Sequence, residues 1–142
     1  MDVNTPFRRV ILVIAAALGL FIGIWAFLLP ESFYSSFPGF GLHWIDQEGA
    51  YDEHLLRDVG AMYLAMSGIT IAAVFQKPAG AGRLAGLGWT IFGALHLGFH
   101  ASHGMTEALD EAGSLASLGV ALALGLILLL PGRVTKTKEA TE

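Results

Sequence analysis

Three histidines near position 100 carry the clearest chemical signal of the sequence. His96, His100 and His103 follow the spacing H-x3-H-x2-H. An α-helix turns by about 100° per residue, so positions 100 and 103 lie within about 40° of position 96 and the three imidazoles project from one face. Such a face can supply two or three nitrogen ligands to a divalent transition metal, and carboxylates can complete the coordination shell.

A second group of candidate ligands lies earlier in the chain. His54 and Asp58 have the i,i+4 spacing that places both on one helix face. An Asp or His in or near hydrocarbon is costly unless it is paired or faces protein or water, so such residues are candidates for function. The predicted metal site comprises His54, Asp58, His96, His100 and His103. Its possible outer members are His43, Asp46, Glu53, Arg57 and Asp110.

The histidine pattern leaves three interpretations open. Interfacial histidines also serve as hydrogen-bonding and titrating residues without a metal. The cluster could therefore bind a transition metal, act as a structural or proton-linked polar cluster, or contact a polar ligand headgroup. The chain contains no cysteine, which excludes a thiolate site. It also lacks a Gly-rich phosphate loop and a nucleophilic serine motif.

The composition indicates that a lipid bilayer surrounds the elements that position these residues. Of 142 residues, 54% are apolar and 14% are charged, whereas soluble domains average about 45–50% and about 25%. Four apolar stretches are long enough to cross a bilayer; they cover about residues 10–29, 59–75, 84–104 and 113–130. We predict an all-α fold, a four-helix transmembrane bundle that forms one integral membrane domain over residues 1–142.

The first apolar stretch has two interpretations. Residues 10–29 form an uncharged run of 20 residues. A cleaved signal peptide has a shorter apolar region, of about 7–15 residues, and a small-x-small cleavage site. We therefore interpret the first stretch as a retained membrane anchor.

The basic residues predict the orientation of the bundle. Seven of the eight flank the apolar stretches on one side: Arg8, Arg9, Lys77, Arg83, Arg133, Lys136 and Lys138. Because Lys and Arg in short flanking loops resist translocation, both termini are expected in the cytoplasm. Most acidic residues and all five histidines then fall in the extracytoplasmic half. No basic stripe suggests a nucleic-acid partner.

The loop between the first two spans, residues 30–57, is long and aromatic. Three rings would share one face of a short interfacial helix: Phe33, Tyr34 and Phe37. Trp44 and Tyr51 could anchor at headgroup depth, and Pro38-Gly39-Phe40-Gly41 should break the short helix. The helical spacing of Tyr51, His54, Leu55 and Asp58 predicts that the second long helix begins before its apolar stretch, with an ion pair between Glu53 and Arg57.

Small residues four positions apart predict how the helices pack. Lipid supplies no hydrophobic drive for helices to associate, so close backbone contact at small residues has to supply it. The predicted contacts are Gly19 with Gly23, Ala61 with Ala65, Gly82 with Gly86, and the series Gly113, Ser117, Ala121 and Gly125. Such faces could also dock a membrane protein partner or a second copy of the chain in a homo-oligomer.

Several motifs together resemble those of a family of small four-span membrane proteins from actinobacteria. They are Ser32-Phe33-Tyr34, Phe37-Pro38-Gly39-Phe40-Gly41-x-His43-Trp44, Tyr51-x-Glu53-His54-x-x-Arg57-Asp58-x-Gly60 and the histidines His96, His100 and His103. The resemblance covers nearly the whole chain, and it implies a four-span fold in an actinobacterial plasma membrane but no activity. In size and span count the chain is also loosely similar to DoxX-like proteins. Where many family members have Pro before the first histidine, this chain has Leu95, which leaves the helix unkinked there.

These features fit functions from three classes, and they do not decide whether the protein is an enzyme. The leading hypothesis is a membrane protein that binds zinc, copper or iron at its outer face for redox, hydrolytic or metal-handling work. In an enzyme, His54, His96 and His100 would be ligands, Asp58 a ligand or an orienting residue, and Glu53 a base. The main alternative is a non-catalytic accessory subunit or scaffold of a larger membrane complex. A proton-linked transporter is the third.

Overall fold

The computed structural model describes residues 3–131, and these are mainly helical. The long helices are α1 (Pro6–Leu28), α3 (Glu53–Val74), α4 (Ala79–Ser102) and α5 (Ala108–Leu129). The short helix α2 (Pro30–Ser36) precedes an antiparallel hairpin of β1 (Pro38–Gly39) and β2 (Leu42–His43). The all-α prediction is therefore confirmed, and the short helix and its break at Pro38 are confirmed with it.

Three of these helices are long and apolar enough to cross a membrane: α1, α3 and α5. This finding is compatible with a membrane protein. Helix α4 covers the third predicted stretch but is not among the three, because its residues include glycines, an arginine and histidines. The four-span count therefore stays a prediction.

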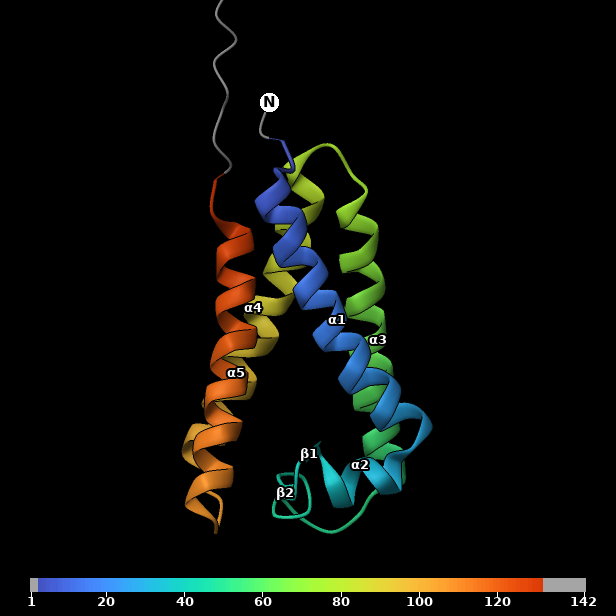
Figure 1. Ribbon diagram of the computed structural model, residues 1–142, viewed down its shortest axis with the longest axis vertical. Helices are drawn as coiled ribbons and strands as arrows, with labels where there is room; N and C mark the ends of the chain where they lie inside the picture. The colour runs from blue at the N-terminus through green and yellow to red at the C-terminus, as the bar shows by residue number, and fades with distance from the viewer. Residues whose placement is uncertain (1–2, 132–142) are drawn as a thin grey trace, which may run out of the picture.

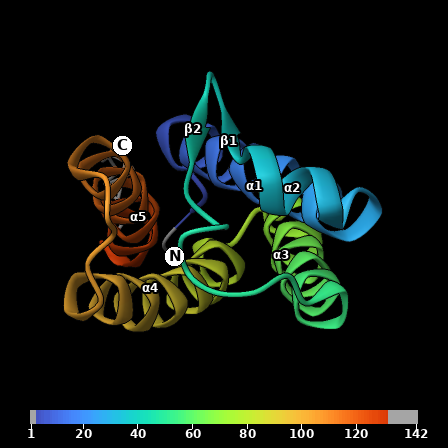
Figure 2. The same cartoon turned by 90° about the horizontal axis from the view of Figure 1, so that it is seen from below.

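The long helices form two pairs that diverge. Helix α1 packs along α3, α4 packs along α5, and contacts between the pairs are fewer. Figure 1 shows the pairs close together near the N-terminus and separated at the opposite end, where α2 and the hairpin lie. We call the first the basic end, after Arg8, Arg9 and Lys77, and the second the loop end. Viewed from the loop end in Figure 2, the chain after β2 runs between the two pairs toward α3.

Glycines allow the two helices of each pair to approach closely. A Cβ atom on Gly19 would lie 2.2 Å from Ser67 Oγ, and one on Gly23 would lie 3.0 Å from the carbonyl oxygen of Gly60. In the other pair, a Cβ atom on Gly125 would lie 2.7 Å from the amide nitrogen of Thr90. The small-residue prediction is thus confirmed for these faces, since no larger side chain fits there.

One predicted small-residue contact is wrong. Ala61 and Ala65 are exposed on α3, and their neighbour Gly60 makes the close contact with α1 instead. A Cβ atom on Gly60 would lie 2.6 Å from the backbone nitrogen of Phe27. The helix is therefore rotated by about one residue, or about 100°, relative to the predicted face.

Trp89 holds the two pairs together in the middle of the bundle. Its side chain is 1% exposed, and its indole N–H donates a hydrogen bond of 2.9 Å to Thr70 Oγ1 on α3. The same ring lies against Gly19 of α1. A single residue of α4 therefore contacts both helices of the other pair.

Residues at and just before the start of α1 donate hydrogen bonds to the C-terminal carbonyls of two other helices. Asn4 Nδ2 donates to the carbonyl of Ala73, and the Arg9 guanidinium donates to that of Val74, both at the end of α3. Arg8 donates to the carbonyl of Leu130, the residue that caps α5. The last carbonyls of a helix have no partner within it and carry partial negative charge, so cationic and amide donors stabilise them.

Three of the basic residues that flank the predicted spans gather at one end of the described structure. Arg8, Arg9 and Lys77 lie together at the basic end, where Asn4 N donates to the Lys77 carbonyl. Arg57 lies at the loop end, where it donates to the carbonyl of Phe27. Arg133, Lys136 and Lys138 lie outside the described residues.

Candidate functional site

The divergence of the helix pairs leaves a cavity at the loop end. Its volume is about 380 Å³, within the range of about 300–1,000 Å³ that small-molecule sites occupy. All four long helices and the loop contribute to its mostly apolar lining. Its polar lining residues are Glu48, Tyr63, His96, His100, Ser114 and Ser117. We call it the loop-end cavity.

Aromatic residues of the loop form one wall of the cavity. The Phe33 ring is 3% exposed and lies 4.6 Å from the ring of Phe37. Phe37 in turn contacts Trp25 of α1 and Trp44 at 5.8 Å and 5.6 Å between ring centroids. The predicted helix therefore forms, but its rings point at the protein rather than outward, since they bury apolar surface against α1.

Gln47 fastens the loop to the start of α5. Its Nε2 donates to Asp110 Oδ2 at 2.7 Å, and its Oε1 accepts from the Thr106 hydroxyl at 2.8 Å. We call these three residues the Gln47 clasp. The clasp joins the loop, which connects α1 to α3, to the start of α5 at the loop end.

Trp44 supports the same connection by packing on α5. Its side chain is 9% exposed, and a Cβ atom on Gly113 would lie 2.9 Å from its Cζ2. Trp44 therefore lies inside the protein, where the sequence had suggested a surface anchor. Its indole N–H is buried without a hydrogen-bond partner, as is Oδ1 of Asp110.

Glu48 and His100 lie side by side in the lining of the cavity. His100 Nδ1 lies 3.1 Å from Glu48 Oε1, and the side chains are 12% and 25% exposed for His100 and Glu48 respectively. The contact is not aligned as a hydrogen bond, because His100 Nδ1 has no partner by hydrogen-bond geometry. Both residues line the cavity, so an imidazole ring and a carboxylate contribute to its surface.

His96 lies beside His100, one turn earlier on α4. The two rings are 4.8 Å apart between centroids, and the His96 ring also stacks on Phe92 at 4.9 Å. Both imidazoles line the loop-end cavity. Two of the three histidines of the predicted face therefore lie next to each other.

The structure separates the other predicted ligands from this pair. His54 Nε2 and Asp58 Oδ2 are 3.3 Å apart, but their side chains are 89% and 66% exposed. His103 is exposed, and its ring stacks on Phe99 at 4.3 Å. None of the three lines the cavity, because α3 turns its His54 face outward and α4 ends at Ser102.

These positions do not fit the predicted metal site. Across residues 3–131, no three His, Asp or Glu side chains come close enough to hold a metal ion. A transition-metal site needs three or four ligands within about 2.0–2.3 Å of one point. Of the five predicted ligands, His96 and His100 lie in the cavity, His54 and Asp58 pair on the surface, and His103 is exposed by itself. The described part of the chain therefore gives no support to a site that they share.

The possible outer members of the site serve local contacts. The Glu53 and Arg57 side chains form the predicted ion pair at 2.8 Å. His43 Nδ1 lies 3.6 Å from Asp46 Oδ2, and Asp110 belongs to the Gln47 clasp. These contacts hold the loop and the start of α3 in place. None of these residues lines the cavity, whose ionisable lining residues besides Tyr63 are Glu48, His96 and His100.

The sequence reasoning missed Gln47, Glu48 and Trp44 as site residues. All three lie in irregular chain between β2 and α3, where no periodic spacing relates them to a helix face. The only available signal was the density of aromatic residues in a loop that also carries acids. That signal predicts a packed loop, but it does not indicate which side chains turn inward.

The lining of the cavity reaches the surface between α3 and α4. Leu55, in the first turn of α3, is 58% exposed, and Phe99, in the last turn of α4, is 54% exposed. Both also line the cavity. An apolar rim of this kind admits apolar molecules more readily than ions.

No model of a known protein family, no curated protein and no solved structure matches this chain. The resemblance to actinobacterial four-span proteins therefore stays a prediction, and function has to be inferred from the cavity itself.

Proposed function

We propose that the protein is an integral membrane protein that binds an uncharged, lipid-soluble molecule in the loop-end cavity. The observation that carries the proposal is the Glu48–His100 pair, which lies with few other polar groups in an otherwise apolar cavity. Binding sites for small molecules combine an apolar lining with a few convergent polar groups that fix the orientation of the ligand. The cavity has this composition.

The polar group of the ligand would be a hydroxyl or a carbonyl. The cavity lining contains a carboxylate and two imidazoles but no Lys or Arg. An anionic headgroup would meet Glu48 without a compensating cation, and burial of an unpaired charge is costly. A hydroxyl can donate to Glu48 and accept from His100, and a carbonyl can accept from His100.

The ligand would enter from the bilayer. In this proposal α4 crosses the membrane with the three apolar helices: its 24 residues span about 36 Å at 1.5 Å per residue, more than a hydrocarbon core of about 30 Å. The basic end faces the cytoplasm, as the positive-inside rule predicts. The exposed rim at Leu55 and Phe99 then opens toward the outer leaflet.

Photolabelling tests the proposal. The probe is hexadecanol with a diazirine in mid-chain, added to purified protein in detergent, and crosslinked peptides are identified by mass spectrometry. We expect labelling of the cavity segments, residues 44–48, 55–63 and 96–105. Glu48→Gln should lower this labelling about tenfold, because a hydrogen bond to a charged group contributes about 1.5 kcal/mol or more.

The matched control is Glu31→Gln, which removes an exposed carboxylate from α2 and should change nothing. The same probe with a terminal carboxylate in place of the hydroxyl should label the cavity weakly. Labels spread over the lipid-facing surface, for example at Ile91 and Leu95, and insensitive to Glu48→Gln would refute the cavity as a binding site.

A further inference from the structure

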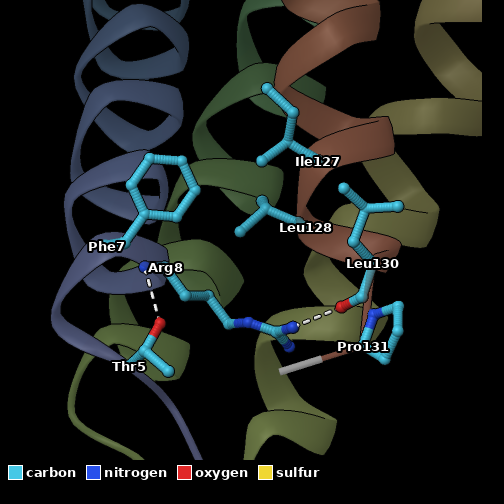
Figure 3. A pocket seen from close by; sticks show the side chains of 7 residues that line it. All are labelled: Thr5, Phe7, Arg8, Ile127, Leu128, Leu130 and Pro131. Atoms are coloured by element: carbon cyan, nitrogen blue, oxygen red, sulfur yellow. Dashed lines mark hydrogen bonds between the residues drawn. The ribbon is translucent and has the colours of Figure 1, made fainter. Parts of the chain in front are cut away.

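A second pocket lies at the basic end, between the start of α1 and the end of α5. Its volume is about 460 Å³. Figure 3 shows the Arg8 side chain extending from α1 toward Leu130, with Phe7, Ile127 and Leu128 above it in this view. Arg8 is the one charged residue of this lining. We call it the basic-end pocket.

Arg8 has no acidic partner among residues 3–131, although its side chain is 5% exposed. The guanidinium donates to the carbonyl oxygens of Ala79 at 3.3 Å and Leu130 at 2.5 Å. A guanidinium has five N–H donors; within residues 3–131 its acceptors are two carbonyl oxygens, whose partial negative charge offsets only part of the full positive charge. A buried charge without a counterion is costly, so an anion that fits the pocket gains a strong contact.

We propose that the basic-end pocket binds an anionic phospholipid, with its phosphate on Arg8 and an acyl chain along Phe7 and Ile127. The planar fork of an arginine matches the oxygens of a phosphate. Phe7 is 64% exposed and Leu130 is 59% exposed, so the apolar wall continues onto the membrane-facing surface. This site is independent of the loop-end cavity and of the ligand proposed there.

The depth of Arg8 agrees with a headgroup contact. Arg8 is the third residue of α1, whose 23 residues cover about 35 Å. The guanidinium therefore lies near one boundary of a hydrocarbon core of about 30 Å, where lipid phosphates are found. Ile127 and Leu128 of α5 line the remainder of the pocket and supply the apolar surface for an acyl chain.

Native mass spectrometry of the purified full chain tests this site. The probes are dioleoyl-phosphatidylglycerol, dioleoyl-phosphatidylcholine and the soluble headgroup glycerol 1-phosphate. We expect the anionic lipid to bind about tenfold more tightly than the zwitterionic lipid with the same chains, since charge-assisted bonds to arginine exceed neutral ones in strength. Arg8→Gln should abolish this preference.

A matched control distinguishes the pocket from general attraction to a basic surface. Lys77→Gln removes one positive charge at the same end from an exposed side chain, and it should retain the preference. Ile127→Trp fills the pocket while keeping Arg8, so it should weaken binding of both lipids. It also keeps the proposal testable where Arg8→Gln does not fold.

Three results would overturn the proposal. Equal binding of the two lipids to the wild-type protein would show that the charge of the headgroup does not contribute to binding. An unchanged preference in Arg8→Gln, or in folded Ile127→Trp with unchanged affinity, would place the lipid elsewhere. Glycerol 1-phosphate binding as tightly as the anionic lipid would show a site for free phosphate compounds instead.

Discussion

Replacing Gly113 by alanine tests whether Trp44 truly docks the loop on α5. The new Cβ atom would lie 2.9 Å from Trp44 Cζ2, whereas carbon atoms in contact are about 3.5–4.0 Å apart. The ring must therefore move, and such overpacking costs about 1–3 kcal/mol. Against this, Ala is favoured over Gly within a helix by about 0.8–1.0 kcal/mol. We expect Gly113→Ala to lower the free energy of unfolding by about 0–2 kcal/mol.

The control for this substitution is Gly119→Ala on the same helix. A Cβ atom on Gly119 has no neighbour within 4 Å. This substitution should therefore raise the free energy of unfolding only by the higher helix propensity of Ala. The assay is unfolding in mixed detergent micelles with increasing dodecyl sulfate, followed by circular dichroism. The difference between the two variants reports the cost of moving Trp44. If Gly113→Ala is stabilised as much as Gly119→Ala, Trp44 does not pack against α5 and the loop is not docked there.

Three further predictions concern the cavity and the core. Gln47→Ala removes the bonds that fasten the loop to α5, so amide hydrogen exchange across residues 44–48 should rise while the middle of α3 stays protected. Trp89→Phe loses the hydrogen bond to Thr70 and should lower the free energy of unfolding by about 0.6–1.7 kcal/mol. The same dodecyl sulfate titration measures this change, and equal stability of the two proteins would contradict the hydrogen bond. His100→Ala should reduce photolabelling by the diazirine alcohol, and His103→Ala, on an exposed ring, should leave it unchanged.

The sequence predicts the helical architecture because long apolar stretches indicate helices directly, and prolines are found at their borders. Pro30 and Pro78 both border helices in the structure. The glycine spacing at positions 19 and 23 also indicates a real packing face, because close helix contact requires small residues there. These features depend on local spacing alone.

The composition of the site depends on helix rotation and loop path, which local spacing does not determine. His54 and Asp58 have perfect i,i+4 spacing, yet that face of α3 turns outward because Gly60 packs against α1. The spacing of His96 and His100 correctly places them on one face, and they reach the cavity because Gly93 and Gly86 bring α4 close to α5. Glu48 reaches His100 only through the tertiary position of the loop.

The contact between Arg8 and the Leu130 carbonyl joins positions 122 residues apart in the chain. During synthesis the arginine leaves the ribosome with the first helix, while its acceptor is made after the last. Its other acceptor, the carbonyl of Ala79, belongs to the first residue of α4. The arginine therefore has only part of its hydrogen bonding until α5 has been made, and we expect the basic end to complete its contacts late in synthesis.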